Sequence, residues 1–141
     1  MKKIFDAWQR FSNPLKTKTV LVIDDSEVDR ILVSRALSKY YHILTASGGR
    51  EGVALAVKEK PDLIVLDFMM PDVNGPDVCR QIRADASLRD IPVIFLTSID
   101  TPHAVVEGLE QEADAYLTKP VKVRDLIEEV SLRINTVGPR M

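Results

Sequence analysis

The sequence predicts an α/β domain with a five-stranded parallel sheet, doubly wound, and five helices. Continuous apolar runs rich in β-branched residues are typical of strands buried on both faces of a sheet. Four such runs occur, at residues 20–23, 63–66, 93–96 and 115–117. A fifth segment, 41–45, alternates between apolar and polar residues and is expected to form an edge strand.

The segments between these runs carry apolar residues at helical spacing. Strands that alternate with helices imply a parallel sheet covered by helices on both faces, with right-handed crossovers. Pro76, after Asn74 and Gly75, suits the first turn of a helix, and residues 102–111 are predicted to form a short one. The positions that carry the helical spacing are Val28, Ile31, Leu32 and Ala36; Val53, Ala56 and Val57; Val78 and Ile82; and Val123, Leu126, Ile127, Val130 and Ile134.

The composition narrows the classes of function. A chain of 141 residues suits one domain, expected at 19–136 between an N-terminal extension, 1–18, and a tail, 137–141. The formal net charge of −2 argues against direct nucleic-acid binding by this chain. A single cysteine, Cys79, allows no internal disulfide, and no apolar run is long enough to span a membrane. A cytoplasmic location is therefore expected.

Chemically useful side chains follow each of the four strong runs. They are Asp24 and Asp25, then Asp67, then Thr97, then Lys119. Because the carboxyl ends of parallel strands share one edge of a sheet, these side chains should converge where α/β folds bind ligands. An aspartate after a strand is by itself more often a turn residue or a helix cap. The presence of such side chains at the ends of all four runs favours a functional site instead.

Electrostatics restricts the chemistry of this site. Two carboxylates about 4 Å apart repel by roughly 4 kcal/mol at an effective dielectric constant near 20. Lys119 offsets one of three negative charges, and a divalent cation would offset the other two. Ligands that are all oxygen favour Mg²⁺, with Mn²⁺ as a possible substitute. A carboxylate beside such an ion can attack phosphorus, which gives an aspartyl phosphate.

Four motifs make the chain similar to the receiver domain of bacterial response regulators. They are VLVIDD (residues 20–25), DFMMPDVNG (67–75), IFLTS (94–98) and ADAYLTKP (113–120). The resemblance covers residues from about 19 to 134 and implies the strand order 2-1-3-4-5. It also implies a signalling phospho-acceptor that catalyses only its own phosphorylation and dephosphorylation.

The resemblance assigns a role to each residue. Asp67 accepts the phosphoryl group from the phosphohistidine of a sensor histidine kinase or from a phosphotransfer protein. Asp24, Asp25 and Asp67 hold Mg²⁺ together with the backbone carbonyl of Met69. Lys119 offsets charge on the phosphoryl oxygens.

The resemblance also implies a switch. Thr97 donates its hydroxyl to the phosphoryl group, and Tyr116 moves inward with it. This movement changes the surface of the fourth helix, the fifth strand and the fifth helix, where a downstream protein partner or an output domain binds. The bond between Lys119 and Pro120 is expected to be cis.

Three positions or segments depart from the family pattern. Met69 and Ile99 are apolar where the family tunes loss of the phosphoryl group, and this predicts slow dephosphorylation. The extension 1–18 carries an apolar stripe at helical spacing, from Ile4 to Leu15, which predicts an amphipathic helix. That helix docks on its own domain, forms a homodimer contact, docks a partner or weakly anchors the chain at a membrane surface. A dimer contact or docking on its own domain is favoured over the other two.

Two other classes of function are alternatives: an enzyme or cofactor binder on the same fold, and an interaction module. A haloacid-dehalogenase-like phosphatase needs an Asp-x-Asp pair after its first strand, whereas this strand ends in Asp24 and Asp25. A flavodoxin-like cofactor binder needs a phosphate loop without acidic residues. A receiver-like interaction module that is not regulated by phosphorylation is the main alternative.

Overall fold

A five-stranded parallel sheet forms the centre of the protein. The structure is a computed structural model that describes residues 17–98 and 113–135. The strands are β1 (Thr19–Ile23), β2 (His42–Ala46), β3 (Leu63–Asp67), β4 (Val93–Ser98) and β5 (Ala115–Lys119). Their order across the sheet is β2-β1-β3-β4-β5, and every neighbouring pair is parallel. The predicted fold class and strand order are confirmed, with β2 at an edge.

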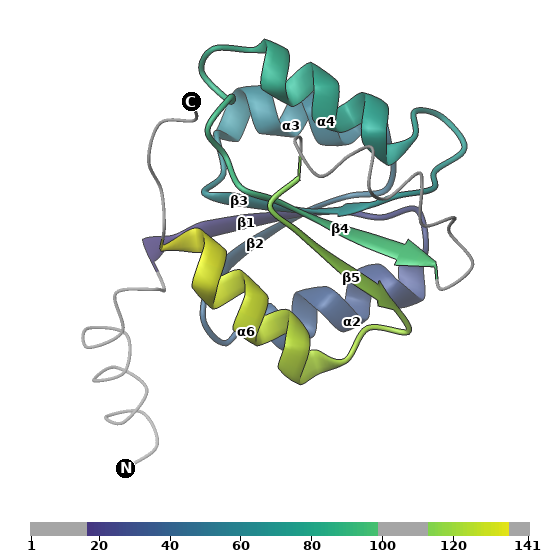
Figure 1. Ribbon diagram of the computed structural model, residues 1–141, viewed down its shortest axis with the longest axis vertical. Helices are drawn as coiled ribbons and strands as arrows, with labels where there is room; N and C mark the ends of the chain where they lie inside the picture. Colours follow the sequence, from purple (N-terminus) through teal and green to yellow (C-terminus); the bar gives the residue numbers. More distant parts are fainter. Residues whose placement is uncertain (1–16, 99–112, 136–141) are drawn as a thin grey trace.

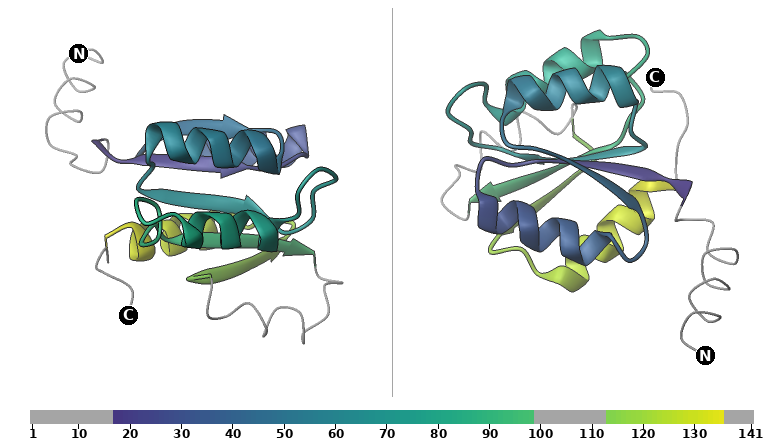
Figure 2. Two further views of the ribbon diagram at one scale, coloured as in Figure 1. Left: turned by 90° about the horizontal axis from the view of Figure 1, so that it is seen from above. Right: turned by 180° about the vertical axis from the view of Figure 1, so that it is seen from behind.

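Helices cover both faces of this sheet. α3 (Gly49–Glu59) and α4 (Gly75–Ala84) lie on one face, and α2 (Glu27–Leu37) and α6 (Val123–Ile134) lie on the other (Figures 1 and 2). These are four of the five predicted helices. The expected helix at 102–111, Ile99, residues 1–16 of the extension and the tail lie outside the described residues.

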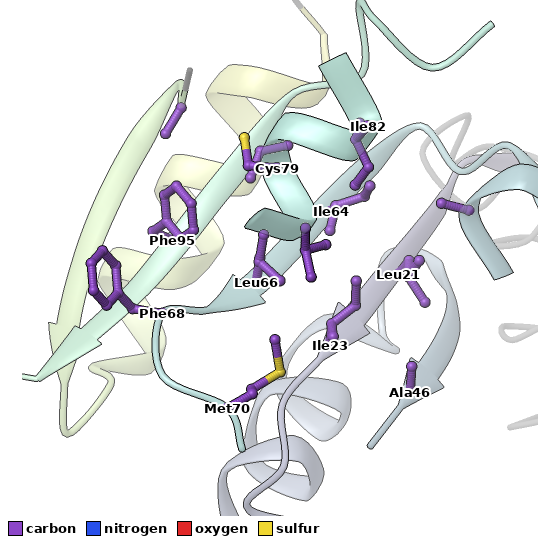
Figure 3. Packing of buried hydrophobic residues seen from close by; sticks show 14 of the residues in the cluster. Leu21, Ile23, Ala46, Ile64, Leu66, Phe68, Met70, Cys79, Ile82 and Phe95 are labelled. Atoms are coloured by element: carbon purple, nitrogen blue, oxygen red, sulfur yellow. The ribbon is translucent and has the colours of Figure 1, made fainter. Parts of the chain in front are cut away.

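Each face of the sheet has its own core because successive side chains of a strand point to opposite faces. On the α3–α4 face, Leu21 and Ile23 of β1 pack with Ile64 and Leu66 of β3 and with Phe95 of β4 (Figure 3). On the α2–α6 face, the alternate residues of the same strands pack with both helices. They are Val20, Val22, Leu63, Val65, Ile94 and Leu96.

Two helices begin immediately beside the carboxyl ends of strands. α2 follows β1 after three residues, with Ser26 as its N-cap: the Ser26 side chain accepts a hydrogen bond from the Asp29 amide at 3.3 Å. α4 is capped by Asn74, whose side chain accepts from the Asp77 amide at 3.0 Å. The Gly75 amide donates to the Phe68 carbonyl at 2.9 Å, which fixes the start of α4 against the end of β3.

The helices of residues 17–98 and 113–135 are all too short or too polar to cross a bilayer.

Candidate functional site

Three predicted carboxylates meet at the carboxyl edge of the sheet. Asp24 is fully buried, Asp67 is 5% exposed and Asp25 is exposed. One oxygen from each lies within 4.8 Å of the oxygens of the other two. The strand register explains this proximity, because Ile23 and Leu66, the residues that precede Asp24 and Asp67, are partners in the β1–β3 ladder.

Lys119, the last residue of β5, reaches across this edge. Its ammonium lies 3.1 Å from Asp24 Oδ2 and 3.2 Å from Asp67 Oδ1. It also lies 3.0 Å from Asp29 Oδ2, in the first turn of α2. The Lys119–Pro120 peptide bond is cis. One ammonium therefore contacts three carboxylates at once.

The proton affinities of these groups follow from their surroundings. Burial raises the pKa of Asp67 to about 7, and the charge of Asp24 adds to that effect while Lys119 opposes it. Burial alone would lower the pKa of Lys119. Its hydrogen bonds to Asp29 and Asp24 outweigh burial, so the pKa of Lys119 is raised. The lysine is a permanent cation, whereas the ionised form of Asp67 is disfavoured.

Asp24 is fixed by its own neighbourhood. Its Oδ1 accepts a hydrogen bond from the Ser26 amide at 2.9 Å, and its backbone carbonyl accepts from Arg30 Nη1 at 2.7 Å. Its amide donates to the Ala46 carbonyl of β2 at 3.1 Å. Its carboxylate is thus held at one orientation beneath the site.

Asp29 is a member of the site that the sequence reasoning missed. The motif Ser26-x-x-Asp29 fits a capping box, in which the last side chain returns to the amide of the first residue. In the structure Asp24 accepts from that amide, and the Asp29 carboxylate pairs with Lys119 instead. No local signal distinguishes the two arrangements.

Thr97 and Tyr116 lie on neighbouring strands. Thr97 is 3% exposed and directly follows Leu96, the ladder partner of Asp67. The ring of Tyr116 stacks on that of Phe95, its ladder partner, with centroids 5.9 Å apart and planes 14° apart. Phe95 in turn meets Phe68 edge-on, with centroids 5.8 Å apart (Figure 3). An aromatic row thus joins the residue after Asp67 to β5.

Of the two residues predicted to tune dephosphorylation, the structure describes only Met69. Met69, two residues after Asp67, has a side chain that is 65% exposed, whereas its neighbour Met70 packs into the core. Ile99 lies outside the described residues.

The acidic edge can hold a divalent cation. Its donors are all carboxylate oxygens, the set that Mg²⁺ and Ca²⁺ prefer. A cation among Asp24, Asp25 and Asp67 would also relieve the repulsion that raises the pKa of Asp67. The residues present therefore fit a hard metal ion.

Comparisons with known proteins agree with this geometry. The sequence model of the response regulator receiver domain matches residues 20–131. Protein PilH of Pseudomonas aeruginosa is 40% identical over 113 residues, which cover 79% of this chain and 93% of PilH. Response regulator PleD of Caulobacter vibrioides is 40% identical over 103 residues, 72% of this chain but 23% of PleD. The chain also spans 54% of the phosphate regulon regulator PhoB of Pseudomonas aeruginosa.

Solved structures have the same fold. The signal receiver domain of a histidine kinase from Syntrophus aciditrophicus superposes with a TM-score of 0.78 at 33% identity, covering 88% of this chain and 95% of that one. Chemotaxis protein CheY4 of Vibrio cholerae superposes with a TM-score of 0.75 at 31% identity, covering 82% and 98% of the two chains. Because the family model matches most of its length, and because the acidic edge and Lys119 at the end of β5 agree with it, the chain belongs to the response regulator receiver domain family of two-component signalling proteins.

Proposed function

We propose that this receiver is a phospho-switch in which Asp67 accepts a phosphoryl group from the phosphohistidine of a sensor histidine kinase or of a phosphotransfer protein. The observation that carries the proposal is the buried Asp67 carboxylate, which lies 3.2 Å from Lys119 and beside Asp24 and Asp25. A buried nucleophile beside a fixed cation suits the transfer of an anionic group.

The transfer forms one bond and breaks one. An oxygen of ionised Asp67 attacks the phosphorus, the phosphorus–nitrogen bond breaks, and its electron pair returns to the imidazole of the donor histidine. Asp24, Asp25, Asp67 and the Met69 carbonyl would hold Mg²⁺, which would supply positive charge for the phosphoryl oxygens. Lys119 and the Thr97 hydroxyl contact the same oxygens and hold the product.

Docking of the donor is supported by the surface beside the site. α2 begins immediately after Asp24 and Asp25, and its outer side exposes Val28, Ile31 and Leu32 at 77%, 44% and 38%. Residues at this spacing form one face of a helix. A helical phosphohistidine protein that buries these side chains would bring its histidine to Asp67.

The downstream signal would pass through Tyr116. When Thr97 turns toward a phosphoryl oxygen, the Tyr116 ring changes its packing against Phe95, and the surface of β5 and α6 changes with it. The helix predicted at 102–111, which the sequence assigns to this surface, lies outside the described residues. This change is a signal only if a partner binds one state better than the other.

The proposal also covers the location and the partners of the chain. The chain works in the cytoplasm, it acts on no other substrate, and it contacts a protein partner or output domain and not nucleic acid directly. The extension 1–18, of which residues 1–16 lie outside the described residues, is proposed to dock on its own domain or to form a homodimer contact. Because the chain spans less than two thirds of PleD and PhoB, the activities of those whole proteins are not transferred to it.

Intact-protein mass spectrometry after incubation with acetyl phosphate and Mg²⁺ tests the proposal. One phosphoryl adduct is expected on the wild-type chain and on Asp125→Asn, which removes an exposed carboxylate of α6. No adduct is expected on Asp67→Asn. An unmodified wild-type chain, or an adduct that survives Asp67→Asn, would favour the interaction module that is not regulated by phosphorylation.

A further inference from the structure

Asp29 is a fourth carboxylate at the acidic edge, and the roles described above do not include it. Its Oδ2 lies 3.0 Å from the ammonium of Lys119, the shortest of the three ion pairs at this lysine. With Asp29 included, four carboxylates face one ammonium. With a divalent cation bound, four carboxylates still outweigh the positive charges of the cation and the ammonium, so the loaded site would keep an excess negative charge.

A purely local role for Asp29 does not fit the contacts. In a capping box its carboxylate would accept from the Ser26 amide. That amide donates to Asp24 Oδ1 at 2.9 Å. Asp29 lies in the first turn of α2, where the helix N-terminus favours a negative charge. Asp29 is thus an anion whose described partner is the ammonium of Lys119.

The ammonium of Lys119 already has three anionic partners. An ammonium has three N–H donors and no acceptor. It has three carboxylate partners, Asp24, Asp29 and Asp67. A phosphoryl oxygen that approaches this ammonium must therefore compete with these carboxylates for it.

Exposure decides which partner is displaced at the lowest cost. The Asp24 side chain is 0% exposed and that of Asp67 is 7% exposed, whereas that of Asp29 is 28% exposed. A carboxylate that leaves an ion pair must be hydrated, and a buried one cannot be without a large penalty. Asp29, at the rim of the site, is the partner that water can replace.

From this arrangement we infer that Asp29 competes with the phosphoryl group for Lys119. It is a positioning residue that holds the ammonium in the resting state and opposes the phosphorylated state. The inference rests on the proposed function. Loss of the Asp29 charge frees a donor of Lys119 and removes a repulsion from the phosphoryl dianion, so it should favour the phosphorylated state by roughly tenfold.

The matched pair Asp29→Asn and Glu27→Gln tests this. Both variants remove one carboxylate from the first turn of α2, but the structure gives Glu27 no contact with Lys119. Affinity for beryllofluoride, which stands in for the phosphoryl group on Asp67, is measured by ¹⁹F NMR at saturating Mg²⁺. We expect roughly tenfold tighter binding for Asp29→Asn, and less than about twofold for Glu27→Gln and for Asp29→Glu, which retains the charge.

The same substitutions in a Lys119→Met variant show whether Asp29 acts by competing for the ammonium or by a structural effect on the site. In Lys119→Met, assayed at higher beryllofluoride concentrations, Asp29→Asn should have no larger effect than Glu27→Gln, because Asp29 acts through the ammonium. Equal affinities of Asp29→Asn and Glu27→Gln in the wild-type background would overturn the inference, as would an Asp29→Asn effect that persists without Lys119. Absence of binding by the wild-type chain would instead contradict the proposed function.

Discussion

Asp72 caps a helix that begins 23 residues before it in the sequence. Its Oδ1 accepts a hydrogen bond from the Gly49 amide at 3.0 Å, and its Oδ2 accepts from the Arg50 amide at 3.1 Å. The N-cap residue of α3, Gly48, has no side chain to do this. Asp72 therefore ties the loop after Asp67 to the start of α3, between two helices on the same face of the sheet (Figure 1).

This cap predicts an acid-dependent loss of stability. Hydrogen bonds from the Gly49 and Arg50 amides lower the pKa of Asp72 to about 2, below its ordinary value of 3.8. A depressed pKa stabilises the folded state above the unfolded pKa, and this contribution is lost as pH falls from about 4 toward 2. Asp72→Asn should lower the midpoint of thermal unfolding at pH 7 by a few degrees, and the difference from wild type should shrink below about pH 4.

Circular dichroism melts across this pH range provide the measurement. The control is Asp125→Asn, which removes an exposed carboxylate from the first turn of α6. Its unfolding midpoint should change with pH in parallel with that of the wild type between pH 4 and pH 2. A difference for Asp72→Asn that stays constant from pH 7 to pH 3 would contradict the cap.

Asp67 has the opposite shift and therefore the opposite pH dependence. An unfolded chain releases the Asp67 proton near pH 4, whereas burial keeps it bound in the folded state to about pH 7. Between these values the folded state binds more protons, so stability falls as pH rises. Asp67→Asn should be more stable than wild type at pH 8, on the order of 2–4 kcal/mol in urea unfolding, and nearly equal to it at pH 4.

Mg²⁺ should reduce that difference. A ligand that binds only the folded state stabilises it by about 2.7 kcal/mol at a concentration 100 times its Kd. The wild-type chain at pH 8 should gain this stability on addition of Mg²⁺, and Asp25→Asn, which removes an exposed carboxylate of the same set, should gain less. Equal gains for both proteins would place the bound ion elsewhere.

The parts of the site that lie at strand ends can be predicted from the sequence. Asp24, Asp67, Thr97 and Lys119 follow apolar runs, and a parallel sheet brings the ends of such runs to one edge, so their grouping follows from fold class. Ladder register then sets their proximity, as for Asp67 and its partner Leu96.

The contacts of Asp29 and Asp72 cannot be predicted from the sequence. Each side chain has two possible partners, and the local sequence does not favour one over the other. Asp29 fits a capping box, and only the placement of Asp24 and Lys119 shows that its carboxylate turns the other way. Asp72 follows Pro71 in a loop and suits a turn, and its bond to Gly49 spans 23 residues. Neither contact has a periodic or local signature.

Gly75 is predicted to tolerate no side chain. A Cβ at this position would lie 2.5 Å from the Asp67 carbonyl oxygen and 2.9 Å from both Phe68 Cα and Phe95 Cε1. Two of these atoms belong to the backbone and cannot turn aside. Gly75→Ala should destabilise the fold by about 1–3 kcal/mol in urea unfolding, the usual range for overpacking.

Gly48→Ala, at the N-cap of α3, is the control for Gly75→Ala. At Gly48, the nearest atoms to an added Cβ belong to the side-chain carboxylate of Asp72, the closest at 2.9 Å, and not to the backbone. Gly48→Ala should therefore cost less stability than Gly75→Ala. It should also leave the rate of phosphorylation by acetyl phosphate nearly unchanged, whereas Gly75→Ala should slow it, because the added methyl group presses on the backbone of Asp67. The reverse order would show that the close approach at Gly75 is relieved without cost.

Met69 provides the test of acyl-phosphate lifetime. Its side chain is 65% exposed two residues after Asp67, and its thioether sulfur, a weak acceptor with no donor, is poorly suited to orient an attacking water. The phosphorylated wild-type chain should decay over minutes or longer. Met69→Asn should speed the decay by about tenfold, equal to about 1.4 kcal/mol of activation free energy.

The measurement is the loss of the phosphoryl adduct, followed by mass spectrometry after the donor is removed. Leu132→Gln, an exposed apolar residue of α6, serves as control and should leave the decay unchanged. Decay of the wild-type adduct within seconds would show that an apolar residue at this position does not protect the acyl phosphate.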